Sequence, residues 1–377
     1  MAGIYLHIPF CKQACSYCNF HFTTSLRYKD DLVKALCREL ELQQAFLQGG
    51  PINTIYFGGG TPSLLSIDDC KQVLDTIRSL YPVNNEAEIT LEGNPDDVTM
   101  EKLLGWKEAG INRLSVGVQS FFEEELRWMN RAHNAGQAHQ CIENIKKAGF
   151  TNYTIDLIYG SPLLSDEQWQ QNVRTAIDYG VPHLSCYALT VEERTPLYKQ
   201  INQHVKEDVD NEKQAGQFLL LMQWLRAAGY EHYEVSNFAR PGFRSRHNSS
   251  YWRREKYLGV GPSAHSYNGR ARTWNIANNN AYIQAIDQGK VPGETEVLTD
   301  IQRLNEYIMI SLRTMEGLDI NAVEKQWGHQ TAALLVKQLQ RYIQNHLVVK
   351  SESHYALKDE GMLRADGIAS DLFFDEQ

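Results

Sequence analysis

Residues 4–18 read IYLHIPFCKQACSYC, an apolar run that leads directly into a loop with three cysteines. The apolar part, residues 4–8, is typical of a buried strand. A long helical pattern follows over about residues 28–48, so this part of the chain has the order strand, loop, helix. The same order recurs along the first two thirds of the chain, which favours an α/β fold with a parallel sheet.

Six further segments have the composition of strands, and helical patterns precede nearly all of them: residues 54–57, 88–92, 113–119, 153–159, 183–189 and 233–236. Glycine stands where a left-handed helix C-cap is expected at Gly110, Gly149, Gly180 and Gly229. The sequence therefore predicts a partial or full (β/α) barrel or a doubly wound sheet, and it does not separate them. In either fold, functional groups gather at the carboxyl ends of the strands.

The pattern changes near residue 300 to consecutive helices over residues 301–315, 321–327 and 331–345. A predicted hairpin over residues 347–357 and a last helix complete a smaller, winged-helix-like α+β domain. Residues 300–377 hold eight Lys and Arg against twelve Asp and Glu, which argues against a surface that reads DNA. We expect three parts: residues 1–240 form the main α/β unit, residues 241–298 a basic and aromatic segment packed on it, and residues 299–377 the C-terminal domain.

The composition is that of a globular protein, with 42% hydrophobic and 22% charged residues. The net charge of −9 excludes bulk attraction to nucleic acid as the organising force. No apolar stretch is long enough to span a membrane, and the first residues lack the pattern of a signal peptide. A disulfide framework does not fit seven cysteines of which three crowd into one loop, so we expect a cytoplasmic protein.

The crowded cysteines are Cys11, Cys15 and Cys18, with the spacing Cys-x-x-x-Cys-x-x-Cys directly after the first strand. Thiolates are the preferred ligands of iron-sulfur clusters, and three of them on a four-iron cluster leave one iron open to another ligand. The alternative is zinc with His7 or His21 as a fourth ligand, but zinc fingers pair two ligands at each of two separated sites. The spacing favours the cluster.

This triplet resembles the cluster motif of the radical S-adenosylmethionine (SAM) superfamily. The resemblance implies a [4Fe-4S] cluster, SAM bound at the open iron, a radical-SAM-type barrel and a reductant such as flavodoxin or ferredoxin. The segment Gly58-Gly59-Gly60-Thr61-Pro62 follows the second strand and resembles the glycine segment that holds SAM in this superfamily. By itself, the segment is equally compatible with a tight turn.

Further motifs resemble the oxygen-independent coproporphyrinogen III oxidase-like branch of the superfamily, among them residues 5–11, 117–121, 156–160 and 259–266. Carried over position by position, the branch implies that SAM contacts a set of polar and strand-end residues. These are Tyr5, Tyr17, Gly59, Gly60, Thr61, Glu92, Gln119, Arg131, Asp156 and Ala188, with Arg131 as the partner of the SAM carboxylate. Tyr5 and Tyr17 are equally compatible with ordinary core aromatics.

The branch contains true oxidases and a group of heme chaperones named HemW. The oxidases carry a fourth cysteine where this chain has Phe20, and they have a long segment before the first barrel strand. Both departures favour the chaperone group and make coproporphyrinogen oxidase activity doubtful. The oxidase, acting through a 5′-deoxyadenosyl radical, is the alternative, and a zinc-stabilised binding module is the third.

Residues 240–256 form the one strongly basic stretch, and they include His247, Asn248, Tyr251 and Trp252. This block resembles the HNxxYW motif associated with heme in the chaperone group. Heme needs an axial donor, aromatic surface and cations for its propionates, and the stretch holds all three. His247 is the expected axial ligand, ahead of His7, His21 and His265. The alternative is an exposed arginine loop with a packed Tyr-Trp pair.

The chaperone function implies heme or another porphyrin and recipient hemoproteins as partners, and the cysteine loop is compatible with a cluster-dependent homodimer.

Overall fold

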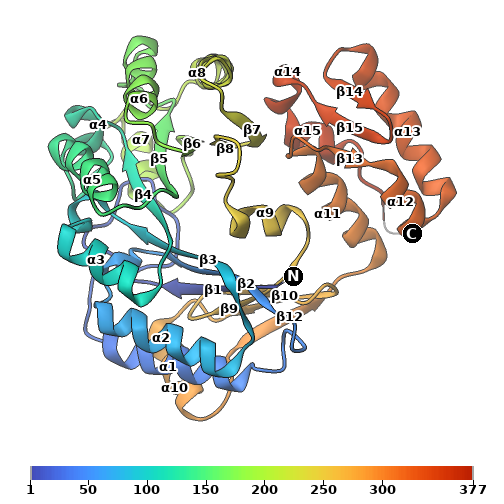
Figure 1. Ribbon diagram of the computed structural model, residues 1–377. Helices are drawn as coiled ribbons and strands as arrows, with labels where there is room; N and C mark the ends of the chain where they lie inside the picture. The colour runs from blue at the N-terminus through green and yellow to red at the C-terminus, as the bar shows by residue number, and fades with distance from the viewer. Residues whose placement is uncertain (1, 376–377) are drawn as a thin grey trace.

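The computed structural model describes residues 2–375, which form an α/β architecture around one twelve-stranded sheet (Figure 1). The strand order is β12-β11-β10-β9-β1-β2-β3-β4-β5-β6-β8-β7. Six consecutive strands run parallel in the centre: β1 (Ala2–Ile8), β2 (Ile52–Gly59), β3 (Val83–Gly93), β4 (Arg113–Gln119), β5 (Tyr153–Tyr159) and β6 (His183–Ala188). The end strands β12 and β7 do not pair with each other within the described residues, so the barrel is partial.

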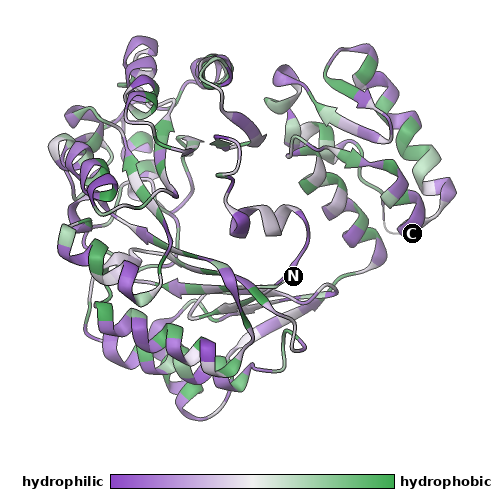
Figure 2. Ribbon diagram, in the orientation of Figure 1, coloured by the Kyte–Doolittle hydropathy of each residue, from purple (hydrophilic) through white to green (hydrophobic). Residues whose placement is uncertain are grey.

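Helices lie on the outer side of the curved sheet (Figure 1). They are α1 (Lys29–Leu42), α2 (Ile67–Leu80), α3 (Met100–Ala109), α4 (Glu123–Trp128), α5 (Ala135–Lys147), α6 (Asp166–Asp178), α7 (Pro196–Asn202) and α8 (Asn211–Ala227). Their apolar faces pack inward, as Leu32, Leu36 and Leu40 of α1 do, whereas hydrophilic residues face outward (Figure 2). The four glycines predicted at helix ends all have positive φ angles, from 69° at Gly180 to 100° at Gly110, which confirms those predictions.

One strand differs from the expectation of a parallel sheet. The segment predicted over residues 233–236 covers only the end of β7 (Glu231–Glu234) and the turn after it, and the next strand, β8 (Asn237–Ala239), pairs antiparallel with β6. Only two residues, Val235 and Ser236, separate the two strands. A connection that short can only reverse the chain, because a parallel partner needs a crossover of a dozen or more residues.

The segment before the C-terminal domain extends the sheet on its other side. Helix α9 (Arg246–Trp252) precedes β9 (Lys256–Val260), which pairs parallel with β1. Strands β10 (His265–Tyr267), β11 (Ala271–Asn275) and β12 (Gly293–Val297) follow in antiparallel order, with α10 (Asn279–Asp287) between the last two.

The side chain of Glu39 in α1 holds this extension against the barrel. It is fully buried and accepts hydrogen bonds from the backbone N–H of Gly261 (2.8 Å), Asn275 Nδ2 (2.7 Å) and the Tyr282 hydroxyl (2.5 Å). One carboxylate therefore joins α1 to the β9–β10 turn, β11 and α10.

We expect Glu39→Ala to lower the free energy of unfolding by about 3 kcal/mol, because three buried donors lose their acceptor. Urea denaturation measures this value. Glu41→Ala is the matched control, since Glu41 is an exposed residue of the same helix and a surface change usually costs less than about 0.5 kcal/mol. Equal losses for the two variants would contradict the role of Glu39.

The C-terminal domain has the predicted three helices and hairpin. The helices are α11 (Asp300–Leu312), α12 (Ile320–Trp327) and α13 (His329–Gln344), and the small sheet has the order β13 (Leu318–Asp319), β15 (His354–Leu357), β14 (Val348–Ser351). Two short helices, α14 (Asp359–Met362) and α15 (Ala365–Ser370), replace the single last helix that the sequence indicates. The domain lies beside α8 and β7 (Figure 1), and an isolated antiparallel β-bridge pairs the backbones of Glu234 and Thr314. Within residues 2–375, no helix has the length and apolar character to cross a membrane.

Candidate cofactor and ligand site

The three crowded cysteines lie in the loop after β1, and backbone hydrogen bonds fix this loop at several points. Cys11 N–H donates to Thr23 O (3.0 Å), and Ser16 N–H donates to Met129 O (3.0 Å). Cys11, Cys15 and Cys18 are half-buried, and none forms a disulfide. Phe20, which stands where the oxidases have a fourth cysteine, is 67% exposed.

Two of the three thiols accept hydrogen bonds from predicted site residues. Arg131 Nη1 lies 3.1 Å from Cys15 Sγ, and Thr61 Oγ1 lies 3.5 Å from Cys11 Sγ. Burial raises the pKa of Cys18 to about 11, a cost that a bound cation offsets because metal ligation deprotonates a thiol. Among the described residues, no three His, Cys, Asp or Glu side chains converge on one metal position. A single ion requires such convergence, whereas in a four-iron cluster each thiolate binds its own iron.

The glycine segment at the end of β2 lies against the strand that leads into this loop. Gly59 has a φ of 106°, and a Cβ atom there would lie 2.6 Å from the ring of His7. Gly60 donates its N–H to Ile8 O at 2.9 Å, and a Cβ there would meet backbone atoms of Phe10 within 3.0 Å. Only glycine permits this approach, which leaves backbone polar groups beside the cysteine loop.

Two buried carboxyl groups lie on strands β3 and β5, on either side of β4. Glu92 on β3 accepts hydrogen bonds from the Tyr56 hydroxyl (2.7 Å) and from Gly59 N–H (3.1 Å). Burial raises the pKa of Glu92 to about 6. Burial and then the charge of Glu92 raise the pKa of Asp156, on β5, to about 7. A positively charged ligand between these groups would stabilise their ionised forms.

Arg131 links the cysteine loop to β4. Its Nη2 donates to Asn94 Oδ1 (2.8 Å) and to Gly117 O (2.7 Å), whereas Nε is buried without a partner among the described residues. Gln119 lies nearby with a φ of 67°, at the irregular end of β4. The donor left on Arg131 fits a carboxylate ligand such as that of SAM.

The three remaining candidates lie around the same end of the sheet. Tyr5 on β1 stacks on Tyr56 at a ring distance of 6.1 Å. Tyr17 packs on a small apolar cluster that includes Leu126 and Met129. Ala188 ends β6. The structure thus brings the cysteines and the SAM candidates to one edge of the sheet, and the residues present fit both a cluster and SAM.

The ring of His247 is enclosed within the barrel. Its side chain is 1% exposed, Nδ1 bonds to Thr54 Oγ1 (2.8 Å), and Nε2 bonds to the Tyr251 hydroxyl (2.8 Å). Burial lowers the pKa of His247 to about 3, so the ring is neutral. The backbone N–H of His247 donates to Glu88 Oε1 at 2.9 Å, which fixes the start of α9 on β3. Both ring nitrogens are therefore engaged.

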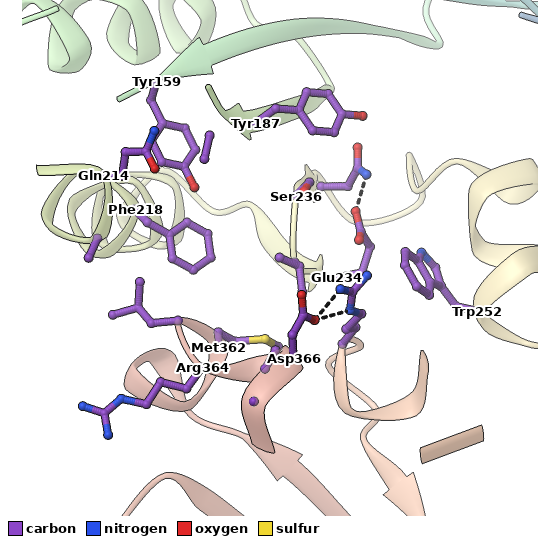
Figure 3. A pocket seen from close by; sticks show the side chains of 18 of the residues that line it. Tyr159, Tyr187, Gln214, Phe218, Glu234, Ser236, Trp252, Met362, Arg364 and Asp366 are labelled. Carbon is purple, nitrogen blue, oxygen red and sulfur yellow. Dashed lines mark hydrogen bonds and ion pairs between the residues drawn. The ribbon is translucent and has the colours of Figure 1, made fainter. Parts of the chain in front are cut away.

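The other three residues of the motif, Asn248, Tyr251 and Trp252, line a cavity of about 620 Å³. Ala188 lines the same cavity. Figure 3 shows Tyr159, Tyr187 and Phe218 on one side and Met362, Arg364 and Asp366 of the C-terminal domain on the other. The cavity thus lies where the sheet, α8, α9 and the C-terminal domain meet, and it is large enough for a cofactor-sized ligand.

The weaker histidine candidates lie elsewhere. His7 Nε2 bonds to His21 O (3.0 Å), and His21 Nε2 bonds to Asn279 Oδ1 (2.7 Å). His265 is exposed and stacks on Trp274 at 6.1 Å. None of the three lines the cavity within the part of the chain that the structure describes.

Sequence reasoning missed several residues of this site. Tyr56 both bonds to Glu92 and stacks on His247 at 4.9 Å, and Asn94 positions Arg131. Alternation along residues 54–57 places Tyr56 on the same face as Thr54, which is a signal that could have found it. Phe218 and Met362 carry no local signal, because only the tertiary fold brings them to the cavity.

Comparison with known proteins agrees with this geometry. Residues 5–209 match the sequence family described as the radical SAM superfamily, and residues 298–364 match the HemN C-terminal domain. The chain is 33% identical over 366 residues to a protein of Bacillus subtilis named heme chaperone HemW, with 96% of this chain and 97% of that protein covered. A Mycobacterium tuberculosis protein of the same name is 34% identical, with 98% and 94% covered.

Among solved structures, the coproporphyrinogen III oxidase HemN of Escherichia coli superposes with a TM-score of 0.85 over 99% of this chain and 90% of that one. At 24% sequence identity this similarity shows only that the two proteins share a fold. The chain therefore belongs to the radical SAM superfamily and, within it, to the family whose curated members are named heme chaperone HemW. Membership of the superfamily implies a [4Fe-4S] cluster and SAM.

Proposed function

We propose that this protein is a radical-SAM-type heme chaperone that binds a [4Fe-4S] cluster, SAM and heme, and passes heme to hemoproteins. The curated relatives of the chain carry the name heme chaperone. The observation that carries the proposal is the cavity of about 620 Å³ that Asn248, Tyr251 and Trp252 line together with Ala188. Three residues of a heme-associated motif thus meet a SAM candidate in one space.

We assign the cluster to Cys11, Cys15 and Cys18. The loop carries three free thiols beside an arginine, and thiolates are the usual ligands of such clusters. A cluster bound by these thiolates would, when reduced, be a source of an electron for the sulfonium of SAM. The chain's own residues fix the loop through backbone hydrogen bonds and donate hydrogen bonds to two thiols.

We assign SAM to the strand ends around Glu92, Gln119, Arg131 and Asp156. Arg131 would hold the SAM carboxylate with its free Nε, and Glu92 and Asp156 would accept hydrogen bonds from the SAM hydroxyl groups and balance its positive charge. Gly59, Gly60 and Thr61 allow the close approach, and Tyr5, Tyr17 and Ala188 complete the contacts.

The raised pKa of Glu92, about 6, predicts that SAM affinity falls as the pH falls. Above pH 6 the carboxylate is ionised and attracts the sulfonium, and below it the group is neutral. We expect the loss of the Glu92 charge alone to raise the SAM dissociation constant about fourfold from pH 7.5 to pH 5.5. Equilibrium dialysis of cluster-loaded protein measures it. Glu92→Gln is the control and should bind weakly at both pH values, with only the pH dependence that Asp156 contributes. A pH dependence as steep as that of the parent protein would contradict the assignment.

The part of His247 in heme binding stays a prediction. Ligation of iron by Nε2 requires Tyr251 to leave its hydrogen bond. In this proposal Asn248, Tyr251 and Trp252 contact the heme directly, and His247 orients Tyr251 through the hydrogen bond to its hydroxyl.

The partners follow from the same proposal. A reductant such as flavodoxin or ferredoxin delivers electrons near the cysteine loop, recipient hemoproteins take the heme, and the exposed ring of Phe20 is where we place a cluster-dependent homodimer contact. All seven cysteines are free, which is typical of a reducing compartment, and we propose the cytoplasm.

An anaerobic heme titration of cluster-reconstituted protein, followed by the Soret band, tests the function. We expect saturable binding of one heme per chain and transfer of that heme to an apo-hemoprotein. Absence of specific binding would overturn the chaperone. Turnover of coproporphyrinogen with SAM and a reductant, run in parallel, would establish the oxidase instead.

A further inference from the structure

The iron of a heme in the cavity needs an axial donor, and the cavity wall offers few. No histidine lines it within the described residues. His247 lies behind Tyr251 with both ring nitrogens bonded. The lining residues that could donate to iron are three tyrosines, Met362, which is 7% exposed, and the acids Glu234 and Asp366. The two acids are already engaged, Glu234 by the side-chain amide of Asn237 and Asp366 by Arg313.

The tyrosines are poor donors here. Iron binds the deprotonated phenolate, and burial raises the pKa values of Tyr159, Tyr187 and Tyr251 above the usual value. The Tyr251 hydroxyl is also occupied by His247. A thioether is neutral, so it donates a lone pair to iron without releasing a proton.

We infer that Met362 of the C-terminal domain is an axial ligand of the heme iron in this cavity. The inference rests on the proposed function and names the donor for it. Figure 3 shows the Met362 sulfur on the wall opposite Tyr187. Methionine is an established type of heme ligand, and its soft sulfur favours ferrous over ferric iron.

Two further features support this wall as the ligand side. Arg364, two residues away, is exposed and forms no ion pair among the described residues, and Figure 3 shows its guanidinium directed outward, so it can meet a heme propionate at the outer rim of the cavity. Ion pairs fix the wall on both sides of Met362: Asp359 with Arg226 of α8 (2.7 Å), and Asp366 with Arg313. The C-terminal domain thus supplies both a donor for iron and a cation.

Full-length protein with a reconstituted cluster tests the inference by heme titration of Met362→Leu and Met362→His. Leucine conserves volume, so we expect ferrous-heme affinity to fall at least about tenfold, with a smaller loss for ferric heme and a shifted Soret band. Met362→His should retain binding and show the spectrum of a nitrogen ligand. Met315→Leu is the matched control, because Met315 lies outside the cavity lining, and it should bind as the parent does.

Unchanged spectra and affinities in both Met362 variants, with normal binding by the parent protein, would overturn the inference and leave the chaperone function intact. Failure of the parent protein to bind heme would overturn the proposed function itself. Loss of the spectrum in His247→Ala alone would assign the iron to His247 instead.

Discussion

Replacement of Cys11, Cys15 and Cys18 with alanine is expected to remove the iron-sulfur cluster completely. The reconstituted parent protein should hold about four iron and four sulfide per chain, and the triple variant should hold almost none. The reason is that these are the only cysteines in the loop after β1, and that two of their thiols already accept hydrogen bonds from Thr61 and Arg131. Iron and acid-labile sulfide analysis, with the visible absorption of the cluster, measures the effect.

Cys37→Ala is the matched control for this experiment. Cys37 is also half-buried and free, but it lies in α1, outside the loop. We expect this variant to keep the full iron content. Zinc without sulfide in the parent protein, or retained iron in the triple variant, would contradict the cluster assignment.

Removal of the Trp252 ring is expected to have the largest effect on heme affinity of any single cavity change outside the iron ligand. Trp252 lines the cavity as part of α9, which the hydrogen bonds to Glu88 hold in place. A tryptophan ring offers a large flat apolar surface to a macrocycle, and its loss at the centre of a binding site costs about 2–3 kcal/mol. We therefore expect the heme dissociation constant of Trp252→Ala to rise about 30- to 150-fold.

Trp327→Ala controls for the loss of a ring in general, since Trp327 packs against Tyr307 in the C-terminal domain and does not line the cavity. Its heme affinity should equal that of the parent protein. Circular dichroism of both variants checks that they fold. An equal loss of affinity in the two would show that heme does not bind in this cavity.

Much of the barrel could be predicted from the sequence because its determinants are local. Apolar runs at residues 113–119 and 153–159 coincide with β4 and β5, and the glycines that end the helices have the expected backbone angles. The hairpin of β7 and β8 was missed because both strands are short and the two-residue turn between them carries no glycine or proline, so the predicted segment ran through the turn.

The candidate site was predictable only in part, because only some of its residues belong to local sequence patterns. The three cysteines lie close together in one segment of the chain, and the glycines of residues 58–60 lie together in another. Their spacing therefore predicts a cluster-binding loop and a close approach to a ligand. His247 is adjacent to Asn248 in sequence, yet its ring lies inside the barrel against Thr54 while Asn248 lines the cavity. A helix sends neighbouring side chains in different directions, and the sequence does not say which direction faces a ligand.

The sequence by itself determined the parallel strands and the family, and it predicts the cysteine loop as a cluster site, because each depends on short-range patterns and on residue types that few other chemistries require. The tertiary structure alone decided which residues share the cavity. Phe218, Trp252 and Met362 lie far apart in the chain, and they meet only because the barrel stays open and the C-terminal domain packs beside β7. Contacts between distant segments are set by the packing of whole elements, which no local pattern records.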